Sequence, residues 1–531
     1  MASEQKDWYN KDRVAIKGSV VLNNWIKTAS PTALRKLAHS KAPFEKTNKR
    51  ELAAARLDRL TASWTTSNVS MNADLYRNLD TTRARANDLA RNNPYAKRYL
   101  AMVVANVVGG DGVRLQSRIY DAPEQPDTIA NSAVEEAFAN WGKKGVCDVT
   151  GRLSWRDIEA QVTENVARDG EAIIRKIRGR TANNPFGFAL QILDINRLDT
   201  SLMRAPEQGR GRIIMGVEVN DFFRPTYYWL KEKNPAEMYM TGVSNTTLHL
   251  RIPAHEIIHI FKQEYPEQVR GLPWMHAGMT LLNHLGAYQE AAVIAARVGA
   301  AKMGFFTTPD GDPAPLQDGT SDGYEDNIPY TEADPGTFGV LPEGVSFESF
   351  NPDYPHQMFG EFIKACLRGV ASSWNVAYHS LANDLEGVNF SSIRSGTLEE
   401  RDQWMSVQQW LIDSFHEQVY TEWLQSALAF GQVLLTNGNA LPLSNYEKFS
   451  KHTWQARRWQ WVDPYKDMQT AVLAIHQRLK SPQQVCAELG MDYEDVLVQC
   501  KSAEDLAAKF GLQPLKPANP DNTTAELDTN I

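Results

Sequence analysis

The chain has 531 residues, too many for one ordinary compact core, so several domains are expected. Hydrophobic residues make up 42% and charged residues 23%, which excludes a disordered or fibrous chain. The formal net charge of −8 argues against a protein that binds DNA phosphates tightly.

Neither a disulfide framework, a secretion signal nor a membrane span is indicated. The charged N-terminus has no signal-peptide pattern. The most apolar run, 291–306, contains Arg297 and Lys302 and is too short and too charged to cross a membrane. The cysteines lack CxxC or other metal-ligand spacing, so we interpret them as reduced thiols. They are Cys147, Cys366, Cys486 and Cys500.

The first half of the chain predicts an arm and then a mixed α+β domain. Residues 1–60 show little periodicity and are interpreted as a solvated arm, although their positive charges could touch DNA or a protein partner. Residues 61–271 contain helical signals, including caps at Asp80-Thr81-Thr82, a break at Asn92-Asn93-Pro94 and a cap at Ser154. Helices are expected over 95–108, 130–141 and 155–169, and strands over 113–116, 172–177, 189–193, 216–219, 223–230 and 247–261.

The second half predicts long helices around a small β-rich insert. An Ala/Gly-rich helix is expected over 272–305, followed by a Pro-, Gly- and Asp-rich module with strands at 338–341 and 345–350. Residues 354–378 return to helical spacing, and a polar loop follows at 379–392. The spacing Thr397-x-x-Glu400 matches a capping box that would begin the next long helix. Its apolar stripe predicts packing rather than a cofactor site: Trp404, Val407, Leu411, Phe415, Val419 and Trp423.

Helix signals continue to residue 512. Asp463-Pro464 and Ser481-Pro482 predict helix starts, and Gly490 and Gly511 predict stops. Beyond about residue 513 the composition predicts disorder. The aromatic and basic run Trp454–Trp461 could stack on nucleic acid, but a core or subunit-interface cluster is the simpler interpretation.

One motif suggests catalysis. His255-Glu256-Ile257-Ile258-His259 matches the H-E-x-x-H pattern of zinc proteases, which needs both histidines on one helical turn. Pro253 and the β-branched residues around the motif predict a strand instead, which would separate the histidines by roughly 13 Å. A zinc metalloprotease is therefore the weaker alternative. The chain has no P-loop motif and no G-x-S-x-G elbow, so we predict no enzyme, cofactor or catalytic or metal residue.

Several short segments together resemble the portal proteins of lambda-type tailed phages, over about residues 80–500. The resemblance lies in the order and spacing of the set. Its members are Arg85–Asn93, Val107–Gly109, Ile257–Phe261, Gln268-Val269-Arg270-Gly271, Leu367–Ala371 with Val376–Tyr378, Asn389–Ser395 and Trp459–Pro464 with Lys466.

The resemblance implies a helix-rich α+β portal fold with wing, stem, clip and crown parts, assembling into a ring of twelve subunits with a central channel. By order along the chain, it maps an arm to 1–60, the wing to 61–271, the first stem helix to 272–304, the clip to 305–353 and the second stem helix to 354–378. It then maps a channel loop to 379–393, the long helix and continued wing to 394–462, the crown to 463–512 and a tail to 513–531.

The resemblance also implies the function and the partners. The ring would stand at the capsid vertex of the virion, and double-stranded DNA would be packaged and ejected through it. Partners would be other copies of the chain, the terminase large subunit, a head-tail connector and the major capsid protein, with no membrane, and assembly would occur in the host cytoplasm. The residues expected to face DNA are Asn383, Asp384, Leu385, Glu386, Gly387, Val388 and Asn389. A non-portal structural head protein remains a further alternative.

Overall fold

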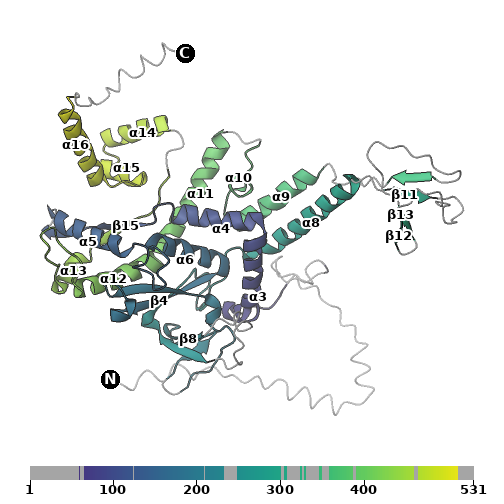
Figure 1. The fold of residues 1–531 in the computed structure, drawn as a ribbon, viewed down its shortest axis with the longest axis horizontal. Helices are drawn as coiled ribbons and strands as arrows, with labels where there is room; N and C mark the ends of the chain where they lie inside the picture. Colours follow the sequence, from purple (N-terminus) through teal and green to yellow (C-terminus); the bar gives the residue numbers. More distant parts are fainter. Residues whose placement is uncertain are drawn as a thin grey trace, which may run out of the picture. The chain divides into compact units, whose positions relative to one another are not determined.

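The computed structural model divides the chain into two units, Met1–Asn68 and Val69–Ile531. It describes residues 59, 65–122, 125–207, 210–232, 248–300, 304–307, 323–325, 328–330, 346–349, 358–386, 390–459 and 464–511. The predicted arm therefore lies almost entirely outside the described residues, as do the predicted strand at 338–341 and the predicted tail. The elements below all belong to the second unit (Figure 1).

The unit begins with two helices separated by the predicted break. Helix α3 (Met71–Asn92) is capped by Ser70, and α4 (Pro94–Val107) by Asn93, whose side chain accepts from the backbone N–H groups of Tyr95 and Ala96. The expected caps at Asp80–Thr82 are wrong, because these residues lie inside α3. There the Asp80 carboxylate accepts a bond from Thr200, and the Thr82 hydroxyl donates to the carbonyl one turn earlier.

The next helices match their predicted limits closely. They are α5 (Thr128–Trp141) and α6 (Trp155–Asp169). Ser154 caps α6 and forms a capping box with Asp157. Helix α6 ends at Gly170, whose φ of +89° is a conformation that glycine adopts without steric cost. This tight ending directs the chain straight into a buried strand.

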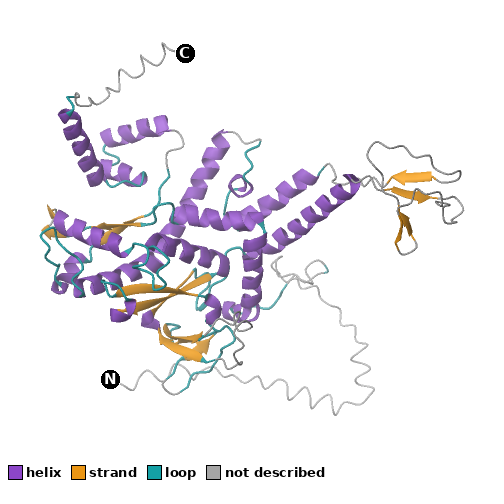
Figure 2. Cartoon of the chain, in the orientation of Figure 1, coloured by secondary structure: helices purple, strands orange, loops and turns teal. Residues whose placement is uncertain are grey.

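The strands form small antiparallel sheets (Figure 2). The central sheet has the order β10-β4-β5, and a second sheet has the order β6-β7-β8-β9. A third pairing joins β1 (Arg114–Ser117) to β15 (His452–Gln455), two segments far apart in the sequence, and β2 (Tyr120–Ala122) pairs with β3 (Gln125–Pro126). The sheet strands are β4 (Glu171–Arg178), β5 (Phe188–Leu193), β6 (Arg212–Ile214), β7 (Val217–Val219), β8 (Pro225–Lys231), β9 (His249–Pro253) and β10 (Ile257–Phe261).

Two helices bracket the β-rich insert. Helix α8 (His276–Ala300) packs against α9 (Phe359–Ser373), and both are shorter than predicted. Between them, β11 (Gly304–Thr307) pairs with β14 (Ser346–Ser349), which confirms the strand predicted at 345–350. A second pair is β12 (Gly323–Glu325) with β13 (Ile328–Tyr330).

The channel loop expected at 379–393 is shorter than predicted. Helix α10 (Tyr378–Ala382) occupies its start and α11 (Phe390–Leu411) its end. The capping box predicted at Thr397 and Glu400 is wrong because both residues lie within α11. Glu400 instead accepts bonds from the Ser380 hydroxyl and from the Trp404 indole.

Helix α11 continues through a π-helical turn (Ile412–His416) into α12 (Glu417–Ala429). After the short α13 (Tyr446–Phe449) come α14 (Pro464–His476), α15 (Pro482–Glu488) and α16 (Tyr493–Lys509). The predicted starts at Pro464 and Pro482 are confirmed, and Ser481 forms a capping box with Gln484.

The main core joins helices from both halves of the sequence. The stripe predicted on α11 and α12 is buried in it, which confirms the packing interpretation. Trp423 contacts Phe138 edge-on and lies beside Trp141, both from α5. A second core lies between α3 and the four-stranded sheet. Among the described residues, no helix is both long and apolar enough to cross a membrane.

Candidate functional site

The non-helical part of the predicted channel loop begins at the end of α10. Asn383 ends this helix in the left-handed conformation, with φ of +53°, which asparagine adopts more readily than most residues. The structure describes Asn383, Asp384, Leu385 and Glu386, whereas Gly387, Val388 and Asn389 lie outside the described residues. Leu385 is 65% exposed, so the loop presents an apolar side chain as well as acidic ones.

Hydrogen bonds hold Asp384 in place. Its carboxylate accepts from the backbone N–H of Glu386 at 3.0 Å and from the Tyr378 hydroxyl at 2.8 Å. These two donors hold the pKa of Asp384 below its ordinary value, because both stabilise the ionised form. Burial, helped by the bond to Asp384, raises the pKa of Tyr378 to about 12, so this hydroxyl stays a donor at neutral pH.

A lysine on α9 balances the acidity of the loop. Lys364 Nζ lies 3.2 Å from Glu386 and 3.9 Å from Asp384. The guanidinium of Arg368, one turn farther along α9, lies 5.4 Å from the centre of the Tyr378 ring. Sequence reasoning expected an acidic loop but did not identify these cations. Neighbouring basic side chains therefore offset its two carboxylates locally.

The loop is tied to two other helices. Arg98 of α4 donates to the Ser380 carbonyl at 3.4 Å, and the Ser380 hydroxyl donates to Glu400 of α11 at 3.0 Å. These contacts hold α10 against α4 on one side and α11 on the other.

The H-E-x-x-H motif does not form a metal site. His255 and Glu256 lie in a short 3-10 helix (Ala254–Glu256), and only His259 lies on the strand β10. Glu256 pairs with Arg175 at 3.0 Å, whereas His259 faces Glu171 at 2.8 Å. Across the described residues, no three His, Cys, Asp or Glu side chains are grouped to hold a metal ion. The structure gives no support to the protease alternative.

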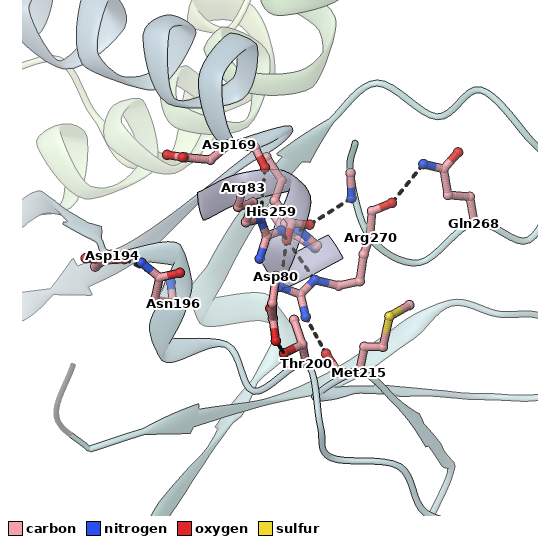
Figure 3. Close-up of polar contacts among 12 residues, drawn as sticks. Asp80, Arg83, Asp169, Asp194, Asn196, Thr200, Met215, His259, Gln268 and Arg270 are labelled. Atoms are coloured by element: carbon pink, nitrogen blue, oxygen red, sulfur yellow. Dashed lines mark hydrogen bonds and ion pairs between the residues drawn. The ribbon is translucent and has the colours of Figure 1, made fainter. Parts of the chain in front are cut away.

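His259 instead lies in a buried cluster with Arg83 and Arg270 (Figure 3). All three side chains contact the carboxylate of Glu171. Glu171 is fully buried at the start of β4. It is ion-paired with Arg83 of α3 and with Arg270, whose Nε lies 2.8 Å away, and it accepts the backbone N–H of Gly271 at 2.9 Å. With the contact to His259, each oxygen of this carboxylate therefore has two hydrogen-bond partners.

Two guanidinium groups set the charge state of this carboxylate. Burial by itself raises the pKa of Glu171, but the charges of Arg270 and Arg83 outweigh it and hold the pKa well below the ordinary value. Glu171 is therefore ionised, and it neutralises cations that would be costly to bury alone. Arg270 also donates to the Met215 carbonyl in the second core, so the cluster joins both cores.

The cluster explains the motif Gln268–Gly271. Gln268 donates to the Arg270 carbonyl at 2.8 Å and fixes the turn that sends the Arg270 side chain inward. A Cβ on Gly271 would lie 2.1 Å from the Gly170 carbonyl oxygen, so only glycine fits there. Sequence reasoning recognised the motif but missed Glu171. The available signal was a glutamate directly before the short apolar run Ala172–Ile174.

A cavity of about 910 Å³ adjoins the cluster, between α3, α6 and the turn after β5. Six acidic and four basic side chains line its wall, so the lining is mixed in charge with a small acidic excess. The charged lining includes Asp80, Asp88, Arg91, Arg168, Asp194 and Lys231.

The aromatic and basic run near residue 454 is mainly structural. Trp454 packs against the main core and donates to Glu417 at 2.9 Å. Trp459 packs against the same core and donates to Asn106 at 3.2 Å, and Arg457 donates to the Ala105 carbonyl near the end of α4. The described part of the run thus ties β15 to α4 and α12, as the core interpretation predicts.

Comparison with known proteins identifies the family. The model of the phage portal protein, lambda family, matches residues 57–408. The probable portal protein of Halomonas phage phiHAP-1 is 34% identical over 457 residues, which are 86% of each chain. Portal protein B of Escherichia phage lambda is 21% identical and covers 82% of this chain and 86% of that protein.

Among solved structures, a chain from the neck of an empty gene transfer agent particle has a TM-score of 0.41 and 15% identity. The match covers 81% of this chain and 97% of the gene transfer agent chain. The matches to the family model and to the Halomonas phage protein each span well over half of the sequence. The chain is therefore a member of the lambda family of phage portal proteins.

Proposed function

We propose that this chain is one subunit of a ring at the capsid vertex through which double-stranded DNA is packaged and ejected. The observation that carries the proposal is the family match over residues 57–408, together with 34% identity to a phage portal protein along 86% of the chain. We propose a structural protein without catalytic activity, located in the virion and assembled in the host cytoplasm. A ring of twelve copies, the terminase large subunit, a connector and the major capsid protein are its proposed partners.

The parts of the portal are assigned by chain order. The wing is 61–271 and continues at 394–462, and 463–512 is the crown. The hairpin of α8 and α9 supports the assignment of 272–304 and 354–378 as stem helices, because a pair of packed helices brackets the insert. The strand pairs within the insert support a clip at 305–353. The arm at 1–60 and the tail at 513–531 receive no specific role.

The channel loop is proposed to be the contact with moving DNA. Its exposed Leu385 and its locally balanced charges suit a surface along which DNA slides without binding tightly. Lys364 would limit the repulsion between phosphates and the two loop carboxylates. The loop then guides the duplex sterically more than electrostatically.

Electron microscopy of the purified protein tests the ring. The expected image is a ring with a central hole, which the portal requires and a structural head protein of another kind does not. A strict monomer under all conditions would argue against a portal.

Deletion of Asp384–Val388 tests the loop. Rings of normal appearance should still form, because the described side chains deleted are mostly exposed, but packaging or retention of DNA should fall. The matched control removes the two negative charges and keeps the length of the loop. The double variant Asp384→Asn with Glu386→Gln should affect packaging less than the deletion does. Normal packaging and retention by the deletion variant would contradict the assignment.

A further inference from the structure

Helix α14 carries an apolar stripe of which no residue is fully buried by the described chain. Tyr465, Met468, Val472 and Ile475 follow each other at intervals of three, four and three residues, as in a helix seam that packs on a partner. Tyr465 is 52% exposed and Met468 is 51% exposed. An isolated helix of 13 residues is marginal in water, so a partner for this stripe is expected.

Helix α16 presents a second exposed apolar surface. Val498, Leu506 and Phe510 lie on one row of residues four apart, with Ser502 between them. Val498 is 68% exposed and Phe510 is 77% exposed. Rows of this spacing form the ridges that enter the grooves of a packed helix. None of the residues of α14 and α16, all of which the structure describes, is buried.

The two surfaces differ in charge. Helix α14 and the turn after it, 464–481, hold three basic residues and one acidic residue. Helix α16 holds four acidic residues and two basic ones: Glu494, Asp495, Glu504, Asp505, Lys501 and Lys509. Counting the turn, where Lys480 is already paired with Glu488, the α14 segment carries a small excess of positive charge and α16 an excess of negative charge. Such surfaces attract each other more than either attracts a copy of itself.

We propose that the α14 stripe of one copy packs on the α16 ridge of the next copy around the ring. The inference rests on the proposed function, because it takes the ring as given. Copies related by rotation about one axis meet through two different surfaces rather than through one surface paired with itself. The stripe and the ridge are two such surfaces, both apolar and opposite in charge. The stripe and the ridge of one copy are thus each covered by a neighbouring copy of this chain.

Cysteine cross-linking of the full chain tests the pairing. In a Cys500→Ser background, Gln469→Cys is placed beside the stripe and Ser502→Cys on the ridge. Mild oxidation, or a short bis-maleimide, should give the double variant a ladder of covalent species larger than a dimer. Each single variant should stay monomeric on a denaturing gel, which controls for the remaining native cysteines. A mixture of the two single variants should stop at the dimer.

Imaging the same samples separates this inference from the proposed function. Rings with the ladder support both. Rings without any species above the monomer would overturn the pairing and leave the portal function intact. Dimers from Gln469→Cys alone would also overturn it, because they would show the stripe paired with itself. Samples that form no ring would overturn the proposed function, and the pairing would fall with it.

A matched pair of substitutions tests the role of charge. Met468→Glu and Met468→Lys remove the same apolar side chain and keep a good helix former. Facing the acidic α16, glutamate should raise the concentration needed for half-assembly by about tenfold or more, and lysine by clearly less. Phe222→Glu, at a position that is 89% exposed, should change it little. Circular dichroism checks that helix content is retained. Equal effects of Glu and Lys, or an effect of Met468→Glu no larger than the control, would refute the proposed contact.

Discussion

Replacing Glu171 by glutamine removes the charge on which the buried ion cluster depends. The side chain keeps its size, and its amide can still accept from one donor. The guanidinium groups of Arg83 and Arg270 remain buried but lose the carboxylate that is ion-paired to both of them. A buried cation without a counter-ion is far costlier than a buried pair. The variant therefore isolates the electrostatic part of the cluster.

The expected loss is about 3–5 kcal/mol, the usual cost of breaking a fully buried ion pair from one side. Both partners are almost completely excluded from solvent, so solvent screening does not reduce this figure. The control is Glu488→Gln, which breaks the pair with Lys480 on the surface. There the side chains are 49% and 43% exposed, and the loss should stay below about 1 kcal/mol.

Hydrogen–deuterium exchange of β4 and β10 measures the effect. These strands pair directly beside the cluster, since Phe261 stands opposite Glu171. A loss of 3–5 kcal/mol predicts roughly two to four powers of ten faster exchange through local opening. If exchange in these strands rises no more than in Glu488→Gln, the cluster does not hold the sheet as argued.

The pH dependence provides an independent check. The pKa of Glu171 is lowered in the folded state, so its contribution to stability is present above its unfolded pKa, about 4.3. That contribution is lost as the pH falls through the lower folded value. The difference between wild type and Glu171→Gln should be constant from neutral pH to about pH 5 and shrink on further acidification. A difference that grows on acidification would refute the assignment of charge.

The remaining predictions concern a second buried carboxylate and one tight turn. Burial raises the pKa of Glu159, which lies 2.6 Å from His416, despite the lowering effect of that histidine. Glu159→Gln should change the unfolding free energy by less than about 1 kcal/mol at neutral pH. Because the folded pKa is raised, the wild type should become less stable relative to the variant as the pH rises above about 4.3, the unfolded pKa. A loss of several kcal/mol would contradict this. Gly271→Ala should destabilise strongly or reduce soluble yield, because its Cβ would overlap the Gly170 carbonyl. Gly360→Ala, with no atom near the new Cβ, is the thermal-shift control and should be neutral or slightly stabilising.

The sequence by itself located most helices and strands. Signals such as Ser154 before α6 and Asn93-Pro94 before α4 act over one helical turn, so they can be read without the fold. The β-branched residues around His259 likewise placed it on a strand and argued against a metal site. The same kind of signal misled at Thr397, because a capping pattern inside a long helix resembles one at its start.

Only the tertiary structure revealed what these segments do together. Arg83, His259 and Arg270 belong to separate parts of the chain, and Glu171 belongs to none of the motifs that carried the resemblance. The fold brings all four together, although Glu171 lies 88 residues after Arg83 and 99 residues before Arg270 in the sequence. The same holds for Lys364, which balances a loop that looked purely acidic in the sequence. Local patterns determine secondary structure because they act through neighbouring backbone groups. The partner of a buried charge depends on chain packing, which no local pattern specifies.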